Sequence, residues 1–264
     1  MIVSDINSIG NRQFNSNELP LHIRNPCREF RDGLLNILTE KLFGIYIYGA
    51  VAFPEAAATS DIDFHVVVTD QLSQKEKSSL VELHDYLQTK YPSPREDFDG
   101  YYLTYADLQD SDPPKHLLYD NIRDESWALH RAHIRAGRVI ILHGPDPRDL
   151  YLPVSWHELE GNLLHELKYV EEHLHEYPHY CILNLCRIVY SFMNQDVVIS
   201  KMASGDWAKR EFPKWTRYID LSKKKYRDDI IGDEERVLIS AVDPIYSEAV
   251  SVISPLLSYQ RRSS

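Results

Sequence analysis

Two aspartates lie one residue apart at the start of the segment DIDFHVVV, in which Asp61 is the first residue. The apolar residues after them predict a β-strand over residues 62–68. Successive side chains point to opposite faces of a strand, so Asp61, Asp63 and His65 share one face and the apolar residues between them point into a core. The spacing therefore predicts two neighbouring carboxylates at the beginning of a buried strand.

Two carboxylates so close repel each other and are costly to desolvate, and a divalent cation relieves both problems. Oxygen ligands at this spacing suit Mg²⁺. Upstream, the strand-like segment GIYIYG ends at Gly49 and Ala50, and a glycine at a strand end lets backbone N–H groups approach an anion. Together these features indicate a nucleoside triphosphate site. Taken alone, the aspartate pair is better explained by a solvated strand edge or a turn cap, and the combination with Gly49 and the two strands is what favours the nucleotide site.

The elements that must position these residues follow from the hydrophobic periodicity. Helices are predicted over residues 28–42, 71–92 and 127–136, and strands over residues 44–49, 62–68, 97–108 and 138–143. From Ser155 onward nearly every segment has helical periodicity, and Glu158 follows Ser155 at the spacing of a capping box. The pattern predicts an α/β domain over residues 1–154 and an all-α domain over residues 155–264.

The composition limits the classes of function. The 264 residues carry a formal net charge of -11, which argues against a protein that grips nucleic acid and fits a cationic partner. Three cysteines without a CxxC spacing favour reduced thiols in a cytoplasm. We expect neither a signal peptide nor a membrane span, because the N-terminus lacks the required pattern and no run of about 18 apolar residues occurs. A monomer is expected.

Two motifs carry a resemblance to a known family. The segment YGAVAFPEAAATSDIDFHVVV, residues 48–68, resembles the signature of the nucleotidyltransferase superfamily, in the version of aminoglycoside adenylyltransferases of the streptomycin/spectinomycin type. Residues 181–213 are similar to that family's C-terminal helical segment, with Arg-x-x-Tyr-Ser, a loop lysine and Ala-x-x-Trp-Ala in order. The resemblance implies a mixed-sheet, polymerase-beta-like nucleotidyltransferase domain followed by an all-α helical bundle.

The resemblance also implies a reaction and a first set of site residues. Such enzymes bind ATP with two Mg²⁺ ions and transfer AMP to a hydroxyl, releasing pyrophosphate. Asp61 and Asp63 match the metal-binding pair, and Gly49 matches the glycine that cradles the phosphates. Ala50 stands where the family has serine, so one hydroxyl that would touch a phosphate is missing. Ser60 could approach the nucleotide from the other strand end.

A third carboxylate is expected from the family on a neighbouring strand, and the segment DFDGYYLTY supplies it. Asp97 and Asp99 share a face by strand parity, and Asp99 is the better match to a position that is usually glutamate. Its role would be either a third metal ligand or the base that takes the proton of the acceptor hydroxyl. The alternative is simple solvation in a polar turn.

Two basic residues of the C-terminal region match residues that reach ATP in the family. Arg187 lies within an apolar helical segment, where a charge is costly unless it is paired. Its alternative role is therefore a buried ion pair with a carboxylate. Lys201 precedes the last part of the motif, and its alternative is a solvated side chain.

Other features do not predict a site. His157, His165 and His173 are spaced by eight residues and so do not share a helix face, and the pair His130 and His133 does not by itself predict a metal site. The leading hypothesis is AMP transfer from ATP to a hydroxyl of a cationic, aminoglycoside-like small molecule. The alternatives are a nucleotidyltransferase for a protein or another small molecule, and a catalytically silent nucleotide-binding homologue.

Overall fold

The computed structural model describes residues 19, 21–55, 61–92, 98–119, 122–227 and 232–257. By internal contacts the chain divides into two compact units, Met1–Pro153 and Val154–Ser264. The assignment of residues 1–154 and 155–264 to two functional domains stays a prediction.

The first unit is built on a mixed four-stranded sheet in the order β3-β2-β1-β4. Strand β1 (Leu42–Tyr48) pairs antiparallel with β2 (Ile62–Val68) and with β4 (Ile140–His143), whereas β2 runs parallel to β3 (Phe98–Thr104). All seven residues of β1 are buried. A strand with neighbours on both sides and cover on both faces reads as a continuous apolar run, which explains its composition.

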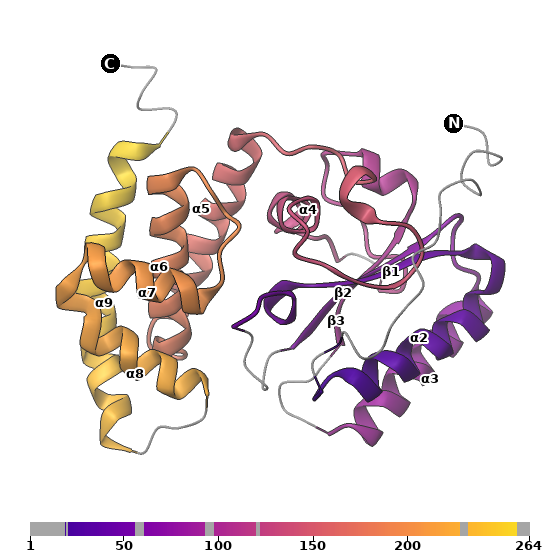
Figure 1. Cartoon of the computed structure of the whole chain (residues 1–264), viewed down its shortest axis with the longest axis horizontal. Helices are drawn as coiled ribbons and strands as arrows, with labels where there is room; N and C mark the ends of the chain where they lie inside the picture. Colours follow the sequence, from indigo (N-terminus) through magenta and orange to yellow (C-terminus); the bar gives the residue numbers. More distant parts are fainter. Residues whose placement is uncertain are drawn as a thin grey trace. The chain divides into compact units, whose positions relative to one another are not determined.

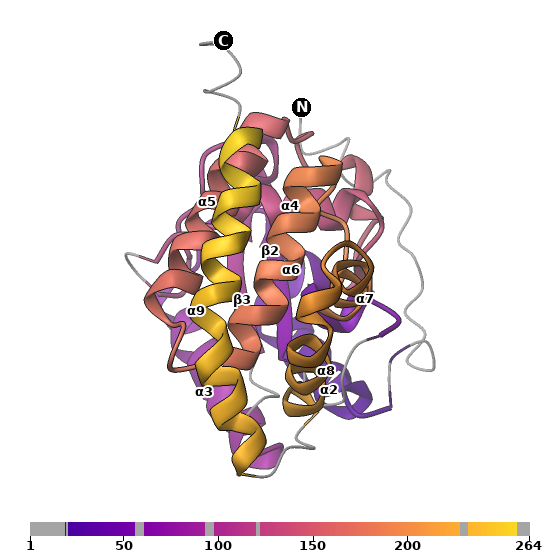
Figure 2. The same cartoon turned by 90° about the vertical axis from the view of Figure 1, so that its left-hand side faces the viewer.

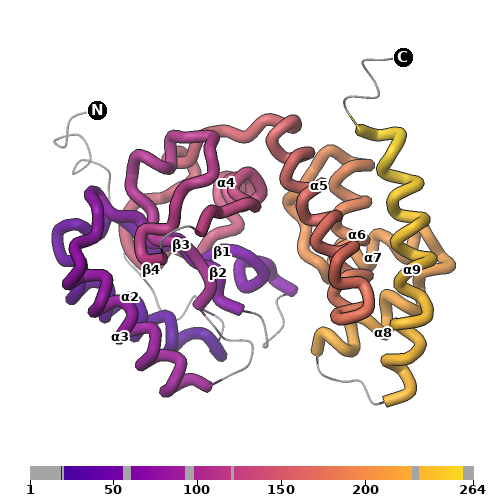
Figure 3. The backbone as a smooth tube through the Cα atoms, turned by 180° about the vertical axis from the view of Figure 1, so that it is seen from behind, coloured from indigo at the N-terminus to yellow at the C-terminus, as the bar shows by residue number. Residues whose placement is uncertain are grey.

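Helices cover both faces of the sheet (Figures 1 and 3). Helices α2 (Arg24–Leu38) and α3 (Gln74–Lys90) lie on one face, and α4 (Trp127–Arg135) lies on the other. The core under α2 and α3 includes Phe30 and Phe64, whose ring centroids are 5.0 Å apart. The core under α4 consists largely of aromatic side chains, including Tyr46, Tyr48, Trp127 and Tyr151.

The second unit is entirely helical in the part that the structure describes. It contains α5 (Trp156–Glu172), α6 (Pro178–Asn194), α7 (Lys201–Glu211), α8 (Thr216–Tyr226) and α9 (Asp233–Ile253). Helix α6 packs against the other four, as Figure 2 illustrates for α9. A helix enclosed by neighbours is apolar around most of its circumference.

The predicted fold class, an α/β unit followed by a helical one, is confirmed, and so is the capping box of Ser155 and Glu158 at the start of α5. Several predicted element boundaries were wrong, most of all those of the first helix and the third strand. The first helix runs over Arg24–Leu38 rather than residues 28–42, because the chain turns into a short 3₁₀ helix at Thr39. The third strand ends at Thr104 rather than at residue 108, because the Asp107 carboxylate accepts the Thr104 N–H (2.6 Å) and starts a turn.

One helical stretch among the described residues, Asp233–Leu256, is long and apolar enough to cross a membrane by length and composition. Its buried residues include Leu238, Val242, Ile245 and Ala249, and α9 packs against α6. A core helix of a folded domain passes the same test, so this helix is only weak evidence for a membrane span.

Helix α3 offers a test of how local capping stabilises the first unit. The Ser73 hydroxyl accepts the Glu76 N–H, and the Glu76 carboxylate accepts the Ser73 N–H and pairs with Lys41 at 2.9 Å. These contacts, chiefly the hydrogen bonds from Ser73 and then Lys41, lower the pKa of Glu76 to about 2. The resulting stabilisation is therefore present above pH of about 4.5 and is lost as the pH falls towards 2.

We predict that Ser73→Ala lowers the free energy of unfolding by about 1 kcal/mol at pH 7, because one helix N–H loses its acceptor. Chemical denaturation at pH 7 and at pH 3 measures this loss. It becomes smaller at pH 3, because the Ser73 side chain also lowers the pKa of Glu76 and that part of the stabilisation is lost as the pH falls from about 4.5 towards 2. The matched control is Ser78→Ala on the exposed side of α3, for which a change within about 0.5 kcal/mol is expected. Equal losses for the two variants would contradict the capping role.

Candidate active site

Three aspartates gather at one end of the sheet, where β2 and β3 both begin. Asp63 is the register partner of Asp99 across the parallel strands, and Tyr48, the last residue of β1, is the partner of Asp63 on its other side. Register partners on adjacent strands point to the same face about 4.8 Å apart. Asp61 directly precedes β2, two residues before Asp63, so strand parity puts the two side chains on one face. We refer to Asp61, Asp63 and Asp99 as the carboxylate edge.

The turn after β1 closes on this edge. Gly49 has φ of +70° and opens a short 3₁₀ turn, Gly49–Ala52. A Cβ atom built on Gly49 would overlap the carboxylate of Asp63. The position thus requires glycine for two reasons, the left-handed backbone and the close approach of the Asp63 side chain. Ala50 follows within the turn and brings no hydroxyl to it.

The carboxylate edge fits Mg²⁺ by its donor set. All three side chains offer only oxygen, the ligand that Mg²⁺ prefers. Asp61 and Asp99 are exposed and Asp63 is half-buried, so the group is open to a ligand. Two other candidates, Ser60 and the alternative Asp97, lie outside the described residues.

The face that carries Asp63 is closed further along the strand. His65 shares that face, as parity predicts, but it is fully buried under Trp127 and Tyr151. Its Nδ1 lies 2.9 Å from the hydroxyl of Tyr151. On this side β2 is thus open to solvent only at its first residues, beside the carboxylate edge.

A group of polar residues lies around His65 that the sequence analysis missed. The carboxylate of Asp124 is buried, and its Oδ2 lies 2.7 Å from Nδ1 of His130 and 3.8 Å from Nε2 of His65. The hydroxyl of Tyr48 is 3.2 Å from the same Nδ1 of His130. We call His65, Asp124 and His130 the buried triad. The only sequence signal for it was a histidine on the aspartate face of a strand.

Burial controls the protonation of these groups. Desolvation lowers the pKa of His65 to about 4, although Asp124 opposes the shift. Desolvation raises the pKa of Asp124, but its two histidine neighbours outweigh it and hold the pKa below its ordinary value. Burial, with the nearby carboxylates of Asp124 and Asp63, raises the pKa of Tyr48 well above its ordinary value. At neutral pH His65 and Tyr48 are therefore uncharged, and Asp124 is a carboxylate.

The two basic candidates belong to the helical unit. Arg187 on α6 pairs with Glu166 on α5 at 3.2 Å, and the same carboxylate oxygen accepts a hydrogen bond from Asn184. The alternative predicted for Arg187, an ion pair with a carboxylate, is therefore present in this structure. Lys201 lies at the start of α7 with its ammonium 4.1 Å from the ring centroid of Tyr180. Neither contact tests a role in nucleotide binding.

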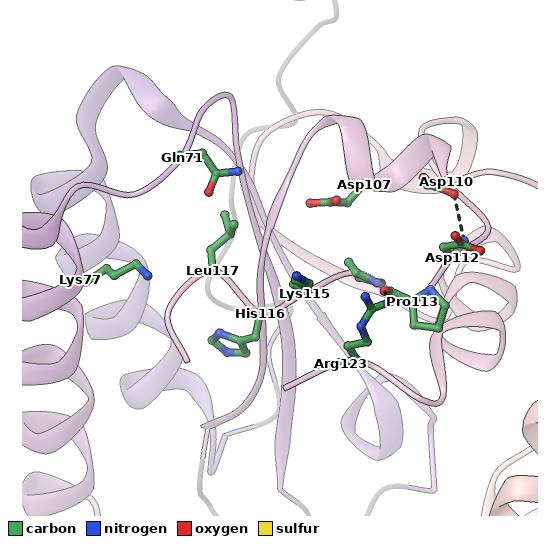
Figure 4. A pocket seen from close by; sticks show the side chains of 11 residues that line it. Gln71, Lys77, Asp107, Asp110, Asp112, Pro113, Lys115, His116, Leu117 and Arg123 are labelled. Carbon is green, nitrogen blue, oxygen red and sulfur yellow. Dashed lines mark hydrogen bonds between the residues drawn. The ribbon is translucent and has the colours of Figure 1, made fainter. Parts of the chain in front are cut away.

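A separate cavity of about 380 Å³ lies in the first unit. Figure 4 shows Lys77, Lys115 and Arg123 around it together with Asp107 and other residues of the segments after β2 and β3. Asp107 follows the end of β3, whereas Asp99 is at its start. The cavity is therefore at the other end of this strand from the carboxylate edge.

The close approach of Gly49 to Asp63 makes a second prediction. Gly49→Ala places a methyl group against the carboxylate and forces a positive φ on alanine, so the free energy of unfolding should fall by at least about 1–2 kcal/mol. The control is Gly161→Ala on α5, where a Cβ meets nothing within 4 Å and where alanine should add roughly 0.5–1 kcal/mol. Denaturant unfolding measures both, and a neutral Gly49→Ala would show that the turn does not press on Asp63.

Comparisons with known proteins agree with this architecture. A family model described as the C-terminal domain of aminoglycoside adenylyltransferase matches residues 149–244. The structure of spectinomycin adenyltransferase AAD(9) from Enterococcus faecialis, solved with ATP and spectinomycin, matches with a TM-score of 0.69 and 16% sequence identity. That match covers 84% of this chain and 98% of the other. No curated protein sequence matches the chain.

The two matches support different statements. At 16% identity the structural match establishes the fold, over nearly the full length of the other chain. The family model covers most of helices α5 to α9, the region that carries the second sequence motif. The resemblance found in the sequence is confirmed: residues 149–244 match the model of the aminoglycoside adenylyltransferase C-terminal domain, and the fold is similar to that of a spectinomycin adenyltransferase.

Proposed function

We propose that the chain transfers AMP from ATP to a hydroxyl of an aminoglycoside-like antibiotic and releases pyrophosphate, with Mg²⁺ as cofactor. The observation that carries the proposal is the register of the sheet, which pairs Asp63 with Asp99 and places the Gly49 turn against Asp63. The family match and the fold, shared with a protein solved with ATP and spectinomycin, support the same reaction class.

In this proposal Asp61 and Asp63 hold the metal, with Asp99 as the third carboxylate of the group. Two bound Mg²⁺ ions would neutralise the phosphate charges and align the attack on the α-phosphorus. Three carboxylates on one edge offer enough anionic oxygen for such ions, and their exposure leaves room for water and phosphate ligands.

In this proposal Asp99 takes the proton of the acceptor hydroxyl. As the acceptor oxygen bonds to the α-phosphorus, the bond to the bridging oxygen of pyrophosphate breaks and the hydroxyl proton must leave. An alcohol has a pKa far above 7, so a carboxylate within reach lowers the barrier as attack proceeds. Asp99 is exposed at the rim of the carboxylate edge, where an acceptor can come close.

The remaining candidates would bind the nucleotide. The turn at Gly49 and Ala50 would present backbone N–H groups to phosphate oxygens, as the first N–H groups of a helical turn have no partner within it. We also assign Ser60, and Arg187 and Lys201 of the helical unit, to the nucleotide. For Arg187 this requires that the phosphates compete with Glu166, its present partner.

The acceptor and the setting follow from charge and chemistry. A net charge of -11 favours a cationic acceptor over a nucleic acid. The three cysteines are free and buried, which suits a reducing compartment that also supplies ATP. We therefore propose a cytoplasmic enzyme that acts as a monomer on small molecules.

A turnover assay tests the proposal directly. Pyrophosphate release is measured with ATP and Mg²⁺ across a panel of aminoglycosides, and mass spectrometry should find a product heavier by one AMP group. Asp61→Asn and Asp63→Asn should abolish release, because the metal needs anionic oxygen. The control is Asp85→Asn, an exposed aspartate on α3, which should keep full turnover.

Two outcomes contradict the proposal. If no aminoglycoside is modified while another acceptor is, the substrate class is wrong. If ATP binds but nothing is adenylylated, the chain is a silent homologue. Near-normal turnover of Asp63→Asn at limiting Mg²⁺ would remove the metal role from the carboxylate edge.

Asp99→Asn separates the two roles of the third carboxylate. A general base acts only while the hydroxyl loses its proton, so kcat should fall by about 10²–10⁴ while ATP affinity in Mg²⁺ is unchanged. A metal ligand acts in the ground state too, so affinity would fall with the rate. Single-turnover rates and ATP titrations give both numbers. If neither changes, Asp99 takes no part in the reaction.

A further inference from the structure

The buried triad has a polar atom without a hydrogen-bond partner. Nε2 of His65 is buried and, among the described residues, makes no hydrogen bond. Oδ2 of Asp124 lies 3.8 Å from it, which is too long for a hydrogen bond. An unsatisfied polar atom in such a place costs about 1–3 kcal/mol and needs an explanation.

Nδ1 of His130, in contrast, has two oxygen atoms within hydrogen-bond distance. Nδ1 of His130 lies near two oxygens, Oδ2 of Asp124 at 2.7 Å and the Tyr48 hydroxyl at 3.2 Å. One imidazole nitrogen carries either a proton or a lone pair, so it can complete a hydrogen bond with only one of them. Two ring nitrogens and a carboxylate oxygen thus lie around one point in the interior.

From this arrangement we propose that the buried triad binds one divalent transition-metal ion of the zinc type, through Nε2 of His65, Oδ2 of Asp124 and Nδ1 of His130. The three atoms lie within 4.8 Å of one another. Tetrahedral zinc with bonds of about 2.0–2.2 Å sets its ligand atoms about 3.4 Å apart. The two separations from Asp124, 2.7 and 3.8 Å, lie on either side of that value.

The surroundings of the ligands support the proposal. The Tyr151 hydroxyl lies 2.9 Å from Nδ1 of His65 and can fix the tautomer that leaves Nε2 free to ligate. The second oxygen of Asp124 accepts the Ser126 N–H at 3.0 Å. Partners of this kind orient metal ligands in zinc sites. The side chain of His130 is 23% exposed, against 0% for His65 and 2% for Asp124, so an ion can enter past His130.

The proposed site differs from the carboxylate edge in position and in chemistry. His65 lies two residues further along β2 than Asp63, under α4 rather than at the open edge. Two imidazoles and one carboxylate select zinc-type ions, whereas three carboxylates select Mg²⁺. The bound ion would be structural: it would fasten α4 and the loop before it to β2, the strand that carries Asp63.

The experiment measures zinc binding by the untagged full-length chain. After stripping with chelator, the protein is equilibrated with a zinc buffer, and bound metal is counted by elemental analysis. Cobalt uptake followed by its visible absorption reports the ligand geometry. We expect one ion per chain with tetrahedral bands and a rise in Tm. The three cysteines should not compete, because burial raises the pKa of each to about 12.

The variants locate the site. His130→Gln and Asp124→Asn should each weaken zinc affinity at least about 10-fold, since even outer-shell changes cost 10–100-fold. His84→Gln is the control, because His84 is a half-buried histidine whose Nε2 lies 2.9 Å from the hydroxyl of Tyr102 on the other face of the sheet. Asp61→Asn should also retain the ion, which separates this site from the carboxylate edge.

Several outcomes would overturn the proposal: no stoichiometric zinc uptake by the wild-type chain, uptake unchanged in His130→Gln and Asp124→Asn, or loss in Asp61→Asn. If both ligand variants fold poorly, His130→Cys tests whether residue 130 ligates the ion, since a thiolate also ligates zinc. That variant should bind the ion, and a folded His130→Cys without zinc would contradict the site. Since none of these measurements depends on turnover, they stand apart from the test of the adenylyltransferase reaction.

Discussion

Asp63 is held between two neighbours by the hydrogen-bond register of the sheet. Parallel pairing with β3 sets Asp99 beside it, and antiparallel pairing with β1 brings the Gly49 turn against its carboxylate. A shift of either register by one residue would turn the partner side chain to the opposite face. The apolar residues of β2 prevent that shift, since Ile62, Phe64 and Val66 must stay in the core under α2 and α3.

The same strand links the open edge to the buried interior. Asp63 and His65 project from one face of β2, the first half-buried and the second fully enclosed by α4 and its neighbours. Carboxylates at the edge keep contact with water, whereas Asp124 is a buried anion whose charge must be balanced by the groups around it. Helix α4 therefore covers the polar side chains of the interior, and it packs on β2, the strand that carries Asp63.

Much of this arrangement could be predicted from the sequence. Strand parity placed Asp61 and Asp63 on one face, and the Ser-x-x-Glu spacing located the start of α5, because both depend on local geometry alone. The pairing of Asp63 with Asp99 agrees with what the family resemblance suggested. Strand parity alone does not predict which residue of β3 pairs with Asp63, since the register depends on how two distant segments pack.

Other features could not be predicted because they join separate segments. The buried triad combines a strand residue, a loop residue and a helix residue, and the HxxH spacing at His130 gives no hint of His65 as the neighbour. Likewise, Arg187 in an apolar helix required a carboxylate partner, but only the packing of α5 on α6 identifies it as Glu166.

The central claim, that the carboxylate edge binds the metal and the nucleotide, is tested most directly by a crystal structure with Mn²⁺ and a non-hydrolysable ATP analogue. Anomalous scattering locates manganese independently of any assumed mechanism. The account predicts anomalous peaks within coordination distance of Asp61 and Asp63, with the triphosphate beside the Gly49 turn. A triphosphate bound elsewhere, or bound with no manganese at Asp63, would contradict it.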